Sequence, residues 1–348
     1  MTGILTGNEK MNVSGCFSQA HLVSGSVMSD EEETFMKAKK ESMQKNSFSY
    51  RLRKDLIRNK GLYLMLLPVI LYYLVFCYYP MYGAQIAFKD FVPKLGIEGS
   101  PFVGFKHFKA FFNSIYFTRL IRNTLSINFF CLVFAFPAPI LLAIMLNEVR
   151  QMRFKKVVQT ISYLPHFIST VVIAGMILEF TSTDGFITTI ATWFGLPKQN
   201  LMYNPDLFQP IYVLSEIWQG IGWGSIIYIA GIAGINGELY EAAKIDGAGR
   251  IKQIFHVTIP GIKPLIVTMF ILKVGNMMSL GFEKIFLLYN SSIYETADVI
   301  STYVYRKGLV DMNYSFSTAV GLFNSVINLI LLYTANKLSK KYTESSLW

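Results

Sequence analysis

The sequence predicts an all-α integral membrane protein with six transmembrane helices. Of the 348 residues, 52% are hydrophobic and only 16% are charged, whereas about 25% of the residues of soluble proteins are charged. Apolar stretches of about 20 residues, long enough to cross a bilayer as a helix, recur along the chain. We place these spans at about residues 61–81, 123–146, 161–180, 207–235, 260–282 and 316–336.

Residues 1–60 precede the first span and form a polar tail without apolar periodicity, which we expect to be disordered. The first span is too long, and its flanks are wrong, for a cleaved signal peptide. Met28 or Met43 could each be the true start of the protein. The rest of the chain, residues 61–348, is expected to form one six-helix membrane domain.

The basic residues predict the orientation. With the N-terminus inside, the inner segments hold about 21 of the Lys and Arg residues and the outer segments hold about 10, which is the bias of membrane proteins. Both termini are therefore expected in the cytoplasm, in a plasma-membrane protein. The net charge of +10 lies beside the spans and not on one soluble domain, so we expect no nucleic-acid partner. The inner segments are the N-terminal tail, residues 147–160 and 236–263, and the C-terminus.

No chemistry-bearing motif is present in the sequence. Cys16, Cys77 and Cys131 are far apart and have neither a disulfide framework nor metal-ligand spacing. The chain also lacks the Gly-x-x-x-x-Gly-Lys-Ser/Thr segment that binds nucleotide phosphates. We therefore expect no catalytic residue, no metal and no cofactor in this chain.

A polar, helix-forming segment, Tyr240–Arg250, separates the fourth and fifth spans. Asn236 can cap its first helical half, and glycines at 247 and 249 are expected to end that helix. Ala242 and Ala243, together with Gly247, leave a bare strip on which another backbone could pack closely. The sequence predicts a docking element on the cytoplasmic face.

This segment resembles the EAA loop of ATP-binding-cassette (ABC) importer permeases. Glu241-Ala242-Ala243 is followed after three residues by Gly247, and after nine more by Val257-Thr258-Ile259-Pro260. Val257 and Ile259 stand where the family pattern has Ile and Leu, which are similar in shape. In the family, this helix sits in a cleft of the ATPase subunit.

The resemblance extends over about residues 61–340 and indicates the maltose-type carbohydrate class, in its LplB-like polysaccharide and multiple-sugar branch. It implies the type I ABC importer permease fold. The stretches that carry it include Phe102–Phe108, Arg122–Leu125, Pro137–Pro139, Asn147–Arg150, Gln159–Phe167, Gly222–Tyr228, Phe286–Asn290 and Thr302–Arg306.

The resemblance implies a permease subunit that forms half of the pore of an importer of oligosaccharides or sugars. Its implied partners are a second, usually non-identical permease, two copies of a cytoplasmic ATPase that bind ATP and Mg²⁺, and an extracytoplasmic sugar-binding protein. Closure of the ATPase cleft would tilt the spans beside the loop as a rigid body. The residues implied in docking are Glu241, Ala242, Ala243, Asp246, Gly247 and Arg250.

Two charged residues lie well inside predicted spans, away from the span ends, where charges tend to face a cavity or a partner. Glu216 and Lys273 fall at similar depth in the fourth and fifth spans, so they either pair near the midplane or face the partner permease separately. His166 is expected to be a hydrogen-bonding residue at a helix end. The candidates for a substrate path, all polar or aromatic and alternatively serving in packing, are Glu216, Trp218, Gln219, Trp223, Lys273, Asn276 and Phe282, with Tyr289 beyond them.

Two other functions fit parts of the pattern. An ion-coupled secondary transporter would need intramembrane carboxylates and repeated halves, and the chain has few such acids and no convincing repeat. A permease of the same fold could also move a different solute, such as an amino acid or phosphate.

Overall fold

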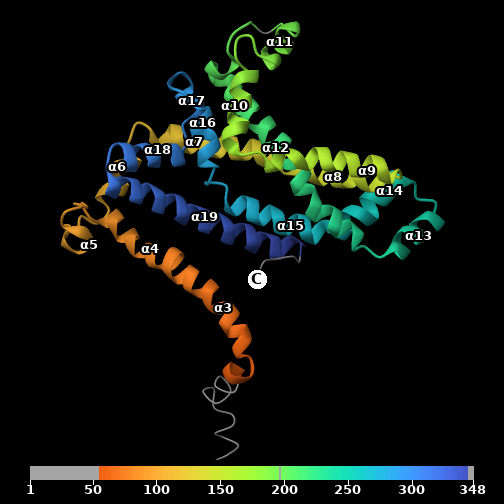
Figure 1. Cartoon of the computed structure of the whole chain (residues 1–348), viewed down its shortest axis with the longest axis horizontal. Helices are drawn as coiled ribbons and strands as arrows, with labels where there is room; N and C mark the ends of the chain where they lie inside the picture. Colours follow the sequence, from red (N-terminus) through yellow and green to blue (C-terminus); the bar gives the residue numbers. More distant parts are fainter. Residues whose placement is uncertain (1–54, 196, 344–348) are drawn as a thin grey trace, which may run out of the picture. The chain divides into compact units, whose positions relative to one another are not determined.

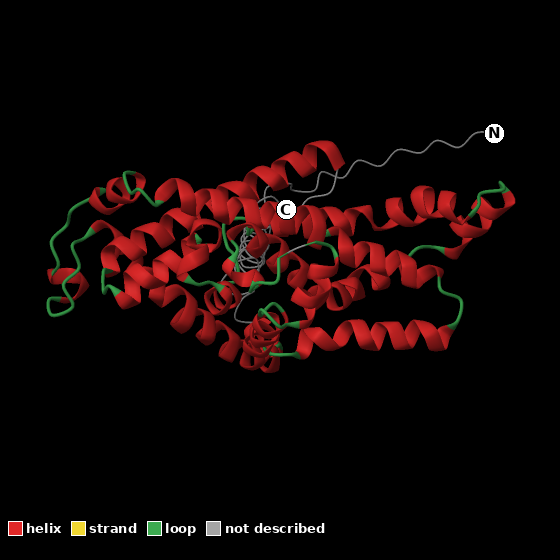
Figure 2. Ribbon diagram, turned by 90° about the horizontal axis from the view of Figure 1, so that it is seen from above, coloured by secondary structure: helices red, strands yellow, loops and turns green. Residues whose placement is uncertain are grey.

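The computed structural model describes residues 55–195 and 197–343. The described chain is helical, apart from loops and an isolated antiparallel bridge between Lys89 and Phe102 (Figures 1 and 2). Two compact units divide it, Met1–Tyr82 and Gly83–Trp348. Most of the tail expected to be disordered lies outside the described residues.

The first unit contains one apolar helix. It comprises α3 (Lys60–Tyr72), a π-helical stretch η1 (Tyr73–Tyr78) and α4 (Tyr79–Met81). None of the residues in its most apolar window is buried within the chain. Its side chains are nevertheless hydrophobic on every side of the helix. A helix of this kind is stable only in lipid or against another protein.

Among the described residues, four continuous helices are long and apolar enough to cross a membrane: Lys60–Phe88, Phe117–Glu148, Arg250–Gly275 and Tyr314–Lys341. Two further candidates are pairs of helices, each bent at a short break, and the count reaches six if each pair is one span. The fold class is therefore that of a helical membrane protein, as predicted.

The second unit contains the remaining helices. Its α-helices are α5 (Gly96–Gly99), α6 (Lys106–Phe112), α7 (Phe117–Phe130), α8 (Pro137–Glu148), α9 (Met152–Tyr163), α10 (Thr170–Phe180), α11 (Phe186–Trp193), α12 (Pro205–Ala233), α13 (Gly237–Ile245), α14 (Arg250–Gln253), α15 (Ile259–Gly275), α16 (Phe282–Leu288), α17 (Tyr294–Ala297), α18 (Ile300–Tyr305) and α19 (Tyr314–Thr343). Short 3₁₀ or π segments are η2 (Tyr82–Phe88), η3 (Cys131–Ala135), η4 (Leu164–Phe167), η5 (Leu201–Tyr203), η6 (Ile254–Thr258), η7 (Ser291–Ile293) and η8 (Arg306–Val310).

The segment predicted as one span over 161–180 is broken. The helix that begins at Met152 ends at Phe167, and α10 leaves it at an angle of 100°. Ser169 starts α10 by accepting a hydrogen bond from the Val172 amide (3.4 Å), as an N-cap does. The residues on both sides of this short polar helix start are apolar, so hydropathy alone did not separate the two helices.

The segment predicted as one span over 260–282 also differs. Helix α15 ends at Gly275, and α16 begins only at Phe282. Within the intervening turn, the Met278 amide donates to the side chain of Asn328 on α19 (2.9 Å). The chain thus changes direction at a depth where a continuous helix was expected.

Helix α12 is the centre of the second unit, and it packs along α8 (Figure 1). Its buried side chains include Phe208 and Tyr212 toward one cluster with Ile173, and Tyr228 toward another with Ile262. These clusters join α12 to α10 on one side and to α8 and α15 on the other. The remaining long helices, α15 and α19, lie against each other, with Leu332 filling the space above Gly275.

A buried carboxylate organises the segment between α16 and α19. Asp298 is fully buried and accepts hydrogen bonds from Arg119 on α7 (3.1 Å) and from Arg306 (2.7 Å). Burial by itself would lower the pKa of Arg306, but the hydrogen bond to Asp298 and its negative charge raise that pKa above its usual value. The guanidinium also lies over the ring of Tyr294, at 4.9 Å. Asp298 therefore fixes this segment to the start of α7.

Gly222 marks a close approach of two helices. A Cβ atom at this position would overlap the backbone carbonyl of Ser162 at the end of α9, whereas a Cβ on Gly220 would meet nothing within 4 Å. Only a residue without a side chain lets α12 lie this near to α9.

We expect Gly222→Ala to lower the free energy of unfolding by about 1–3 kcal/mol, because the backbone of α9 must shift to admit the methyl group. The matched control Gly220→Ala should leave it unchanged or slightly raised, since alanine favours the helix. The thermal midpoint of the purified protein in detergent measures both. Equal midpoints for the two variants would contradict the close approach.

Candidate functional site

A buried ion pair joins α12 to α16. The Lys284 Nζ atom lies 2.8 Å from a carboxylate oxygen of Glu216 and 3.2 Å from the amide oxygen of Gln219. It also lies 5.5 Å from the centre of the Tyr212 ring. The side chain of Lys284 is 5% exposed, whereas that of Glu216 is 35% exposed. One end of the pair is therefore enclosed and the other reaches open space.

This geometry settles the question of a pair between Glu216 and Lys273. The carboxylate of Glu216 is bound by Lys284 instead, and Lys273 is exposed and forms no salt bridge with any described residue. Of the two alternatives that the sequence left open for Glu216 and Lys273, the mutual pair is wrong, because Glu216 contacts Lys284, which the sequence did not indicate.

Lys284 was missed because it lies just beyond the predicted fifth span, residues 260–282. The signal that could have found it is local: Lys284 is the only basic residue in the short apolar helix Phe282–Leu288, adjacent to Ile285 on its buried face. A single lysine on the buried face of a helix requires a counter-charge.

An aromatic platform lies where the bent span meets α12. The rings of His166 and Trp223 stack in parallel, with centroids 4.5 Å apart and an angle of 4° between them. Phe167 contacts the Trp223 ring edge-on at 5.6 Å. All three side chains are exposed, so a flat aromatic surface faces outward. His166, expected to serve only as a helix-end residue, is part of this surface.

The other predicted path residues are spread over different surfaces. Trp218 lines an apolar groove of ≈ 390 Å³ against α10. Asn276 ends α15, and its side chain donates back to the Leu272 carbonyl (3.0 Å). Phe282 stacks on Phe286 and lines a separate groove between α18 and α19. Of the seven candidates, the structure brings Glu216 and Gln219 into one contact network.

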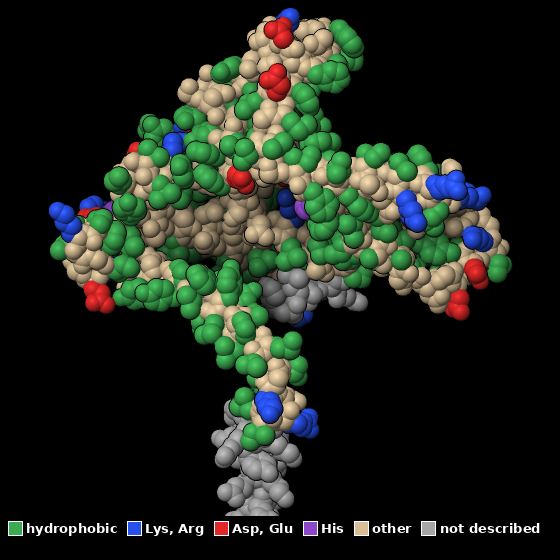
Figure 3. All heavy atoms as spheres, in the orientation of Figure 1, with side chains coloured by type: hydrophobic (Ala, Val, Ile, Leu, Met, Phe, Trp, Pro, Cys, Tyr) green, Lys and Arg blue, Asp and Glu red, His purple; other side chains and the backbone are tan. Residues whose placement is uncertain are grey.

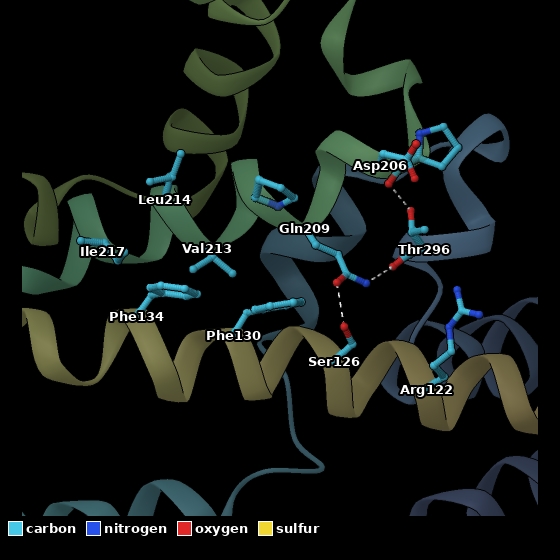
Figure 4. A pocket seen from close by; sticks show the side chains of 12 residues that line it. Arg122, Ser126, Phe130, Phe134, Asp206, Gln209, Val213, Leu214, Ile217 and Thr296 are labelled. Carbon is cyan, nitrogen blue, oxygen red and sulfur yellow. Dashed lines mark hydrogen bonds between the residues drawn. The ribbon is translucent and has the colours of Figure 1, made fainter.

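A larger groove, which the sequence did not indicate, runs between α7 and α12 (Figure 4). Its volume is ≈ 590 Å³. Gln209 crosses it, accepting a hydrogen bond from Ser126 (2.8 Å) and donating to the Thr296 carbonyl (3.5 Å). Arg122 and other polar groups line one end and aromatic rings the other, so the groove is amphipathic.

The predicted docking element forms two short helices, α13 and α14. The Asn236 side chain accepts from the Glu238 amide (3.0 Å) and caps α13, as predicted. Gly247 has a φ of +73°. The Ala248 amide bonds the Ala243 carbonyl (2.8 Å), and the Gly247 amide bonds that of Lys244 (3.0 Å). This pair of bonds is a Schellman motif, which favours glycine at its left-handed position.

The surface of this element is open and mixed in character. Of the residues implied in docking, Glu241, Ala242, Asp246, Gly247 and Arg250 are exposed, and Ala243 is half-buried. Glu241 forms no hydrogen bond or salt bridge with any described residue. Large apolar side chains stand beside these positions with more than half of their surface exposed: Leu239, Ile245, Ile251 and Phe255.

The element is tied to the following long helix. The Tyr240 hydroxyl lies 3.0 Å from the hydroxyl of Thr258, which is buried at the end of η6, immediately before α15. Gln253 donates to the Ala248 carbonyl (2.8 Å) and fixes α14 to the end of α13. Short hydrogen-bonded contacts therefore link α13 to α14 and to the residue that precedes α15.

The same end of the molecule carries basic residues. The turn before α9 and its first residues expose Arg150, Arg153 and Lys156. Figure 3 shows Lys and Arg side chains gathered over this end, which also bears α13 and α14. In the described parts of the chain, no three His, Cys, Asp or Glu side chains are grouped as metal ligands would be.

These features define a multi-pass membrane protein with a surface-exposed docking element. The chain belongs to the family of binding-protein-dependent transport system inner membrane components, whose model matches residues 135–343. Proteins of this family are the permease subunits of ABC importers. This chain is therefore a permease and not an enzyme, and the ATPase is a separate subunit.

The relatives include a permease that is named for polysaccharide transport. The chain is 46% identical to the polygalacturonan/rhamnogalacturonan transport system permease protein YteP of Bacillus subtilis, over 86% of this chain and 93% of that protein. It is 44% identical to protein LplB of the same organism, over 84% and 92%. The resemblance to the LplB-like branch is thus confirmed.

A solved structure has the same fold. One chain of the bacterial alginate ABC transporter, in complex with an alginate pentasaccharide-bound periplasmic protein, superposes with a TM-score of 0.78 at 44% identity. The match covers 85% of this chain and 100% of that one. It confirms the type I ABC permease architecture.

The ion pair predicts the result of a double-mutant cycle. Glu216→Ala should lower the thermal midpoint strongly, because it leaves the enclosed Lys284 without its counter-charge, and removing one partner of a buried pair costs about 3–5 kcal/mol. Adding Lys284→Met should restore much of that loss. The matched control, Glu216→Ala with Lys273→Met, should restore nothing, and rescue by this second pair would contradict the observed pairing.

Proposed function

We propose that this chain forms half of the translocation pore of an ATP-driven importer of oligosaccharides, and receives force from a separate ATPase through α13 and α14. The observation that carries the proposal is the exposed docking element with its contact from Tyr240 to Thr258. A surface of apolar side chains and an unpaired glutamate serves no purpose within this chain alone, but it suits a partner's cleft.

The names of the relatives support a sugar as the solute. YteP is named for polygalacturonan and rhamnogalacturonan, and two others, at 31% and 28% identity, are named for arabinooligosaccharides. The alginate transporter was solved with a pentasaccharide on its periplasmic protein. An oligosaccharide is therefore a better proposal for this chain than an amino acid or phosphate.

The proposed partners are a second permease, two copies of the ATPase and an extracytoplasmic sugar-binding protein. ATP and Mg²⁺ would be bound by the ATPase alone. The proposed topology has six spans, with each bent pair counted as one, and both termini in the cytoplasm. It is supported by the basic residues on the end that bears α13, because cytoplasmic loops are enriched in Lys and Arg.

The proposed path for the sugar runs beside the ion pair. Sugars are bound by aromatic faces together with polar groups that pair with hydroxyls, and both are available on neighbouring turns of α12. Trp223 with His166 supplies the flat face, and Glu216 with Gln219 supplies polar groups. Lys273, Asn276, Trp218 and Phe282 remain proposed path residues, the last two in separate grooves.

We expect Glu241→Ala to abolish most of the coupling between transport and ATP hydrolysis, because the docking helix loses the exposed charge proposed to contact the ATPase. In proteoliposomes with the complete transporter, ATPase activity stimulated by the sugar-loaded binding protein should fall about tenfold, which is about 1.4 kcal/mol of lost contact energy. The control Glu179→Ala removes an exposed carboxylate at the end of α10 and should leave the stimulation unchanged. Undiminished stimulation in Glu241→Ala would refute the proposed docking.

The Schellman turn offers a second test. Gly247→Ala forces a side chain into the left-handed region at a cost of about 1–2 kcal/mol, so α13 should lose its fixed end and its affinity for the ATPase. Gly249 has a φ of −65° and open space around it, so Gly249→Ala should bind normally. Co-purification of the ATPase with each variant measures the difference, and equal yields would exclude a role for the turn.

A further inference from the structure

The groove between α7 and α12 has a charged end and an apolar end (Figure 4). Arg122 and Asp206 line the charged end, near the starts of the two helices. The other end is lined by apolar side chains, among them Phe134 and Leu214, which are 55% and 65% exposed. Neither the proposed sugar path nor the docking element uses this groove, so its occupant is unassigned.

The groove is about as long as one leaflet of a bilayer. Its lining residues on α7 and the continuation η3 recur every four positions and so share one face: Arg122, Ser126, Phe130 and Phe134. From the first to the last of these residues the chain rises about 18 Å, at 1.5 Å per residue. The hydrocarbon core of a bilayer is about 30 Å thick, so the groove extends over about half of it.

The charged end lies away from the docking element. Asp206 is in the first turn of α12, and α13 follows the far end of that helix (Figure 1). In the proposed orientation, with α13 in the cytoplasm, the charged end therefore lies at the outer surface of the membrane. The apolar end points toward the middle of the membrane. A lipid of the outer leaflet has its charged and apolar parts in this order.

Both charges at this end are available to a ligand. Arg122 and Asp206 are exposed, and neither forms a salt bridge with any residue that the structure describes. Pro210 has no amide hydrogen, so the Asp206 carbonyl also lacks its usual donor within the helix. An occupant with an anionic group for Arg122 and a hydrogen-bonding cation for Asp206 would satisfy this end of the groove.

The deeper part of the groove suits an acyl chain. Gln209 marks the boundary, and its amide oxygen already accepts from Ser126 (2.8 Å). Beyond it, the rings of Phe130 and Phe134 stack with centroids 6.4 Å apart and 20° between their planes. The facing wall on α12 is also apolar, with Val213, Leu214 and Ile217. An apolar chain is stabilised on such a surface, whereas the hydroxyl groups of a sugar would lose their hydrogen bonds there.

The volume of the groove favours a thin occupant. It measures ≈ 590 Å³, whereas an α-helix of the same length and about 10 Å across would fill about 1,400 Å³. A helix of another subunit would therefore enter the groove only in part, and a single lipid chain is the better fit.

We propose that this groove binds one outer-leaflet phospholipid with an ethanolamine headgroup. Arg122 binds the phosphate, and Asp206 accepts hydrogen bonds from the ammonium group. One acyl chain lies along Phe130 and Phe134. A choline headgroup has no N–H to donate and a glycerol headgroup has no positive charge, so both bind less tightly. This inference goes beyond the proposed sugar import, because the lipid is not transported, and it shares with that proposal only the orientation in the membrane.

The test uses the complete transporter, with its partner permease and ATPase, in phosphatidylcholine liposomes that contain a small share of a phosphatidylethanolamine probe. The probe carries a diazirine in the middle of one acyl chain, so that light attaches it to the side chains beside that chain. We expect labelled peptides from the parts of α7 and α12 that line the groove. Unlabelled phosphatidylethanolamine should suppress the labelling at a lower concentration than phosphatidylglycerol does.

Three variants and one control test the assigned contacts. Arg122→Gln and Asp206→Asn should each lower labelling of the groove about tenfold, because each removes a charge-assisted hydrogen bond. Leu214→Trp should lower it by filling the apolar end, with both charges kept. The control Arg153→Gln removes an exposed arginine near the start of α9 and should leave the labelling unchanged. Co-purification of the partner permease and the ATPase with each variant shows that it is folded.

The other outcomes would overturn the inference. Equal labelling of the wild type and all variants would mean that lipid touches this surface without a binding site. Equal or stronger competition by phosphatidylglycerol would remove the assignment of ethanolamine. An unlabelled groove, or loss of the partner permease with Arg122→Gln or Asp206→Asn, would assign the groove to that subunit. None of these results bears on sugar import, which the stimulation of ATP hydrolysis tests separately.

Discussion

The structure depends on one constraint: inside a membrane, every charge and every backbone polar group must be paired or must face water. Glu216 and Lys284 satisfy it by pairing at 2.8 Å. That pair places the short helix α16 against the middle of α12, immediately after the chain has left the helical path at Gly275. The break in the fifth span and the ion pair are therefore parts of one arrangement.

The central position of α12 follows from the same constraint. It contributes the acid of the ion pair, one ring of the aromatic platform and a wall of the groove in Figure 4. Gly222 permits its close contact with the end of α9. A helix that serves several surfaces cannot be regularly amphipathic, which explains why its sequence reads as uniformly apolar with isolated polar positions.

The proposed transmission of force needs an element that is both rigid and exposed to a partner. Helix α13 is closed at its start by Asn236 and at its end by the turn at Gly247. Tyr240 then fixes it to Thr258 and the helix beyond. Because both ends of α13 are capped and Tyr240 contacts Thr258, the helix has the fixed ends that the proposed transmission of force requires.

The sequence by itself determined the fold class, the approximate spans and the docking element, because each rests on contacts between residues near in the chain: apolar windows, a capping asparagine and a glycine turn. The tertiary structure alone decided the partner of Glu216, the stacking of His166 on Trp223 and the bends at 168–169 and 276–281. These depend on which helices lie side by side. The sequence offered Lys273 as the possible partner of Glu216, and only the tertiary structure brings Lys284 on α16 to that carboxylate.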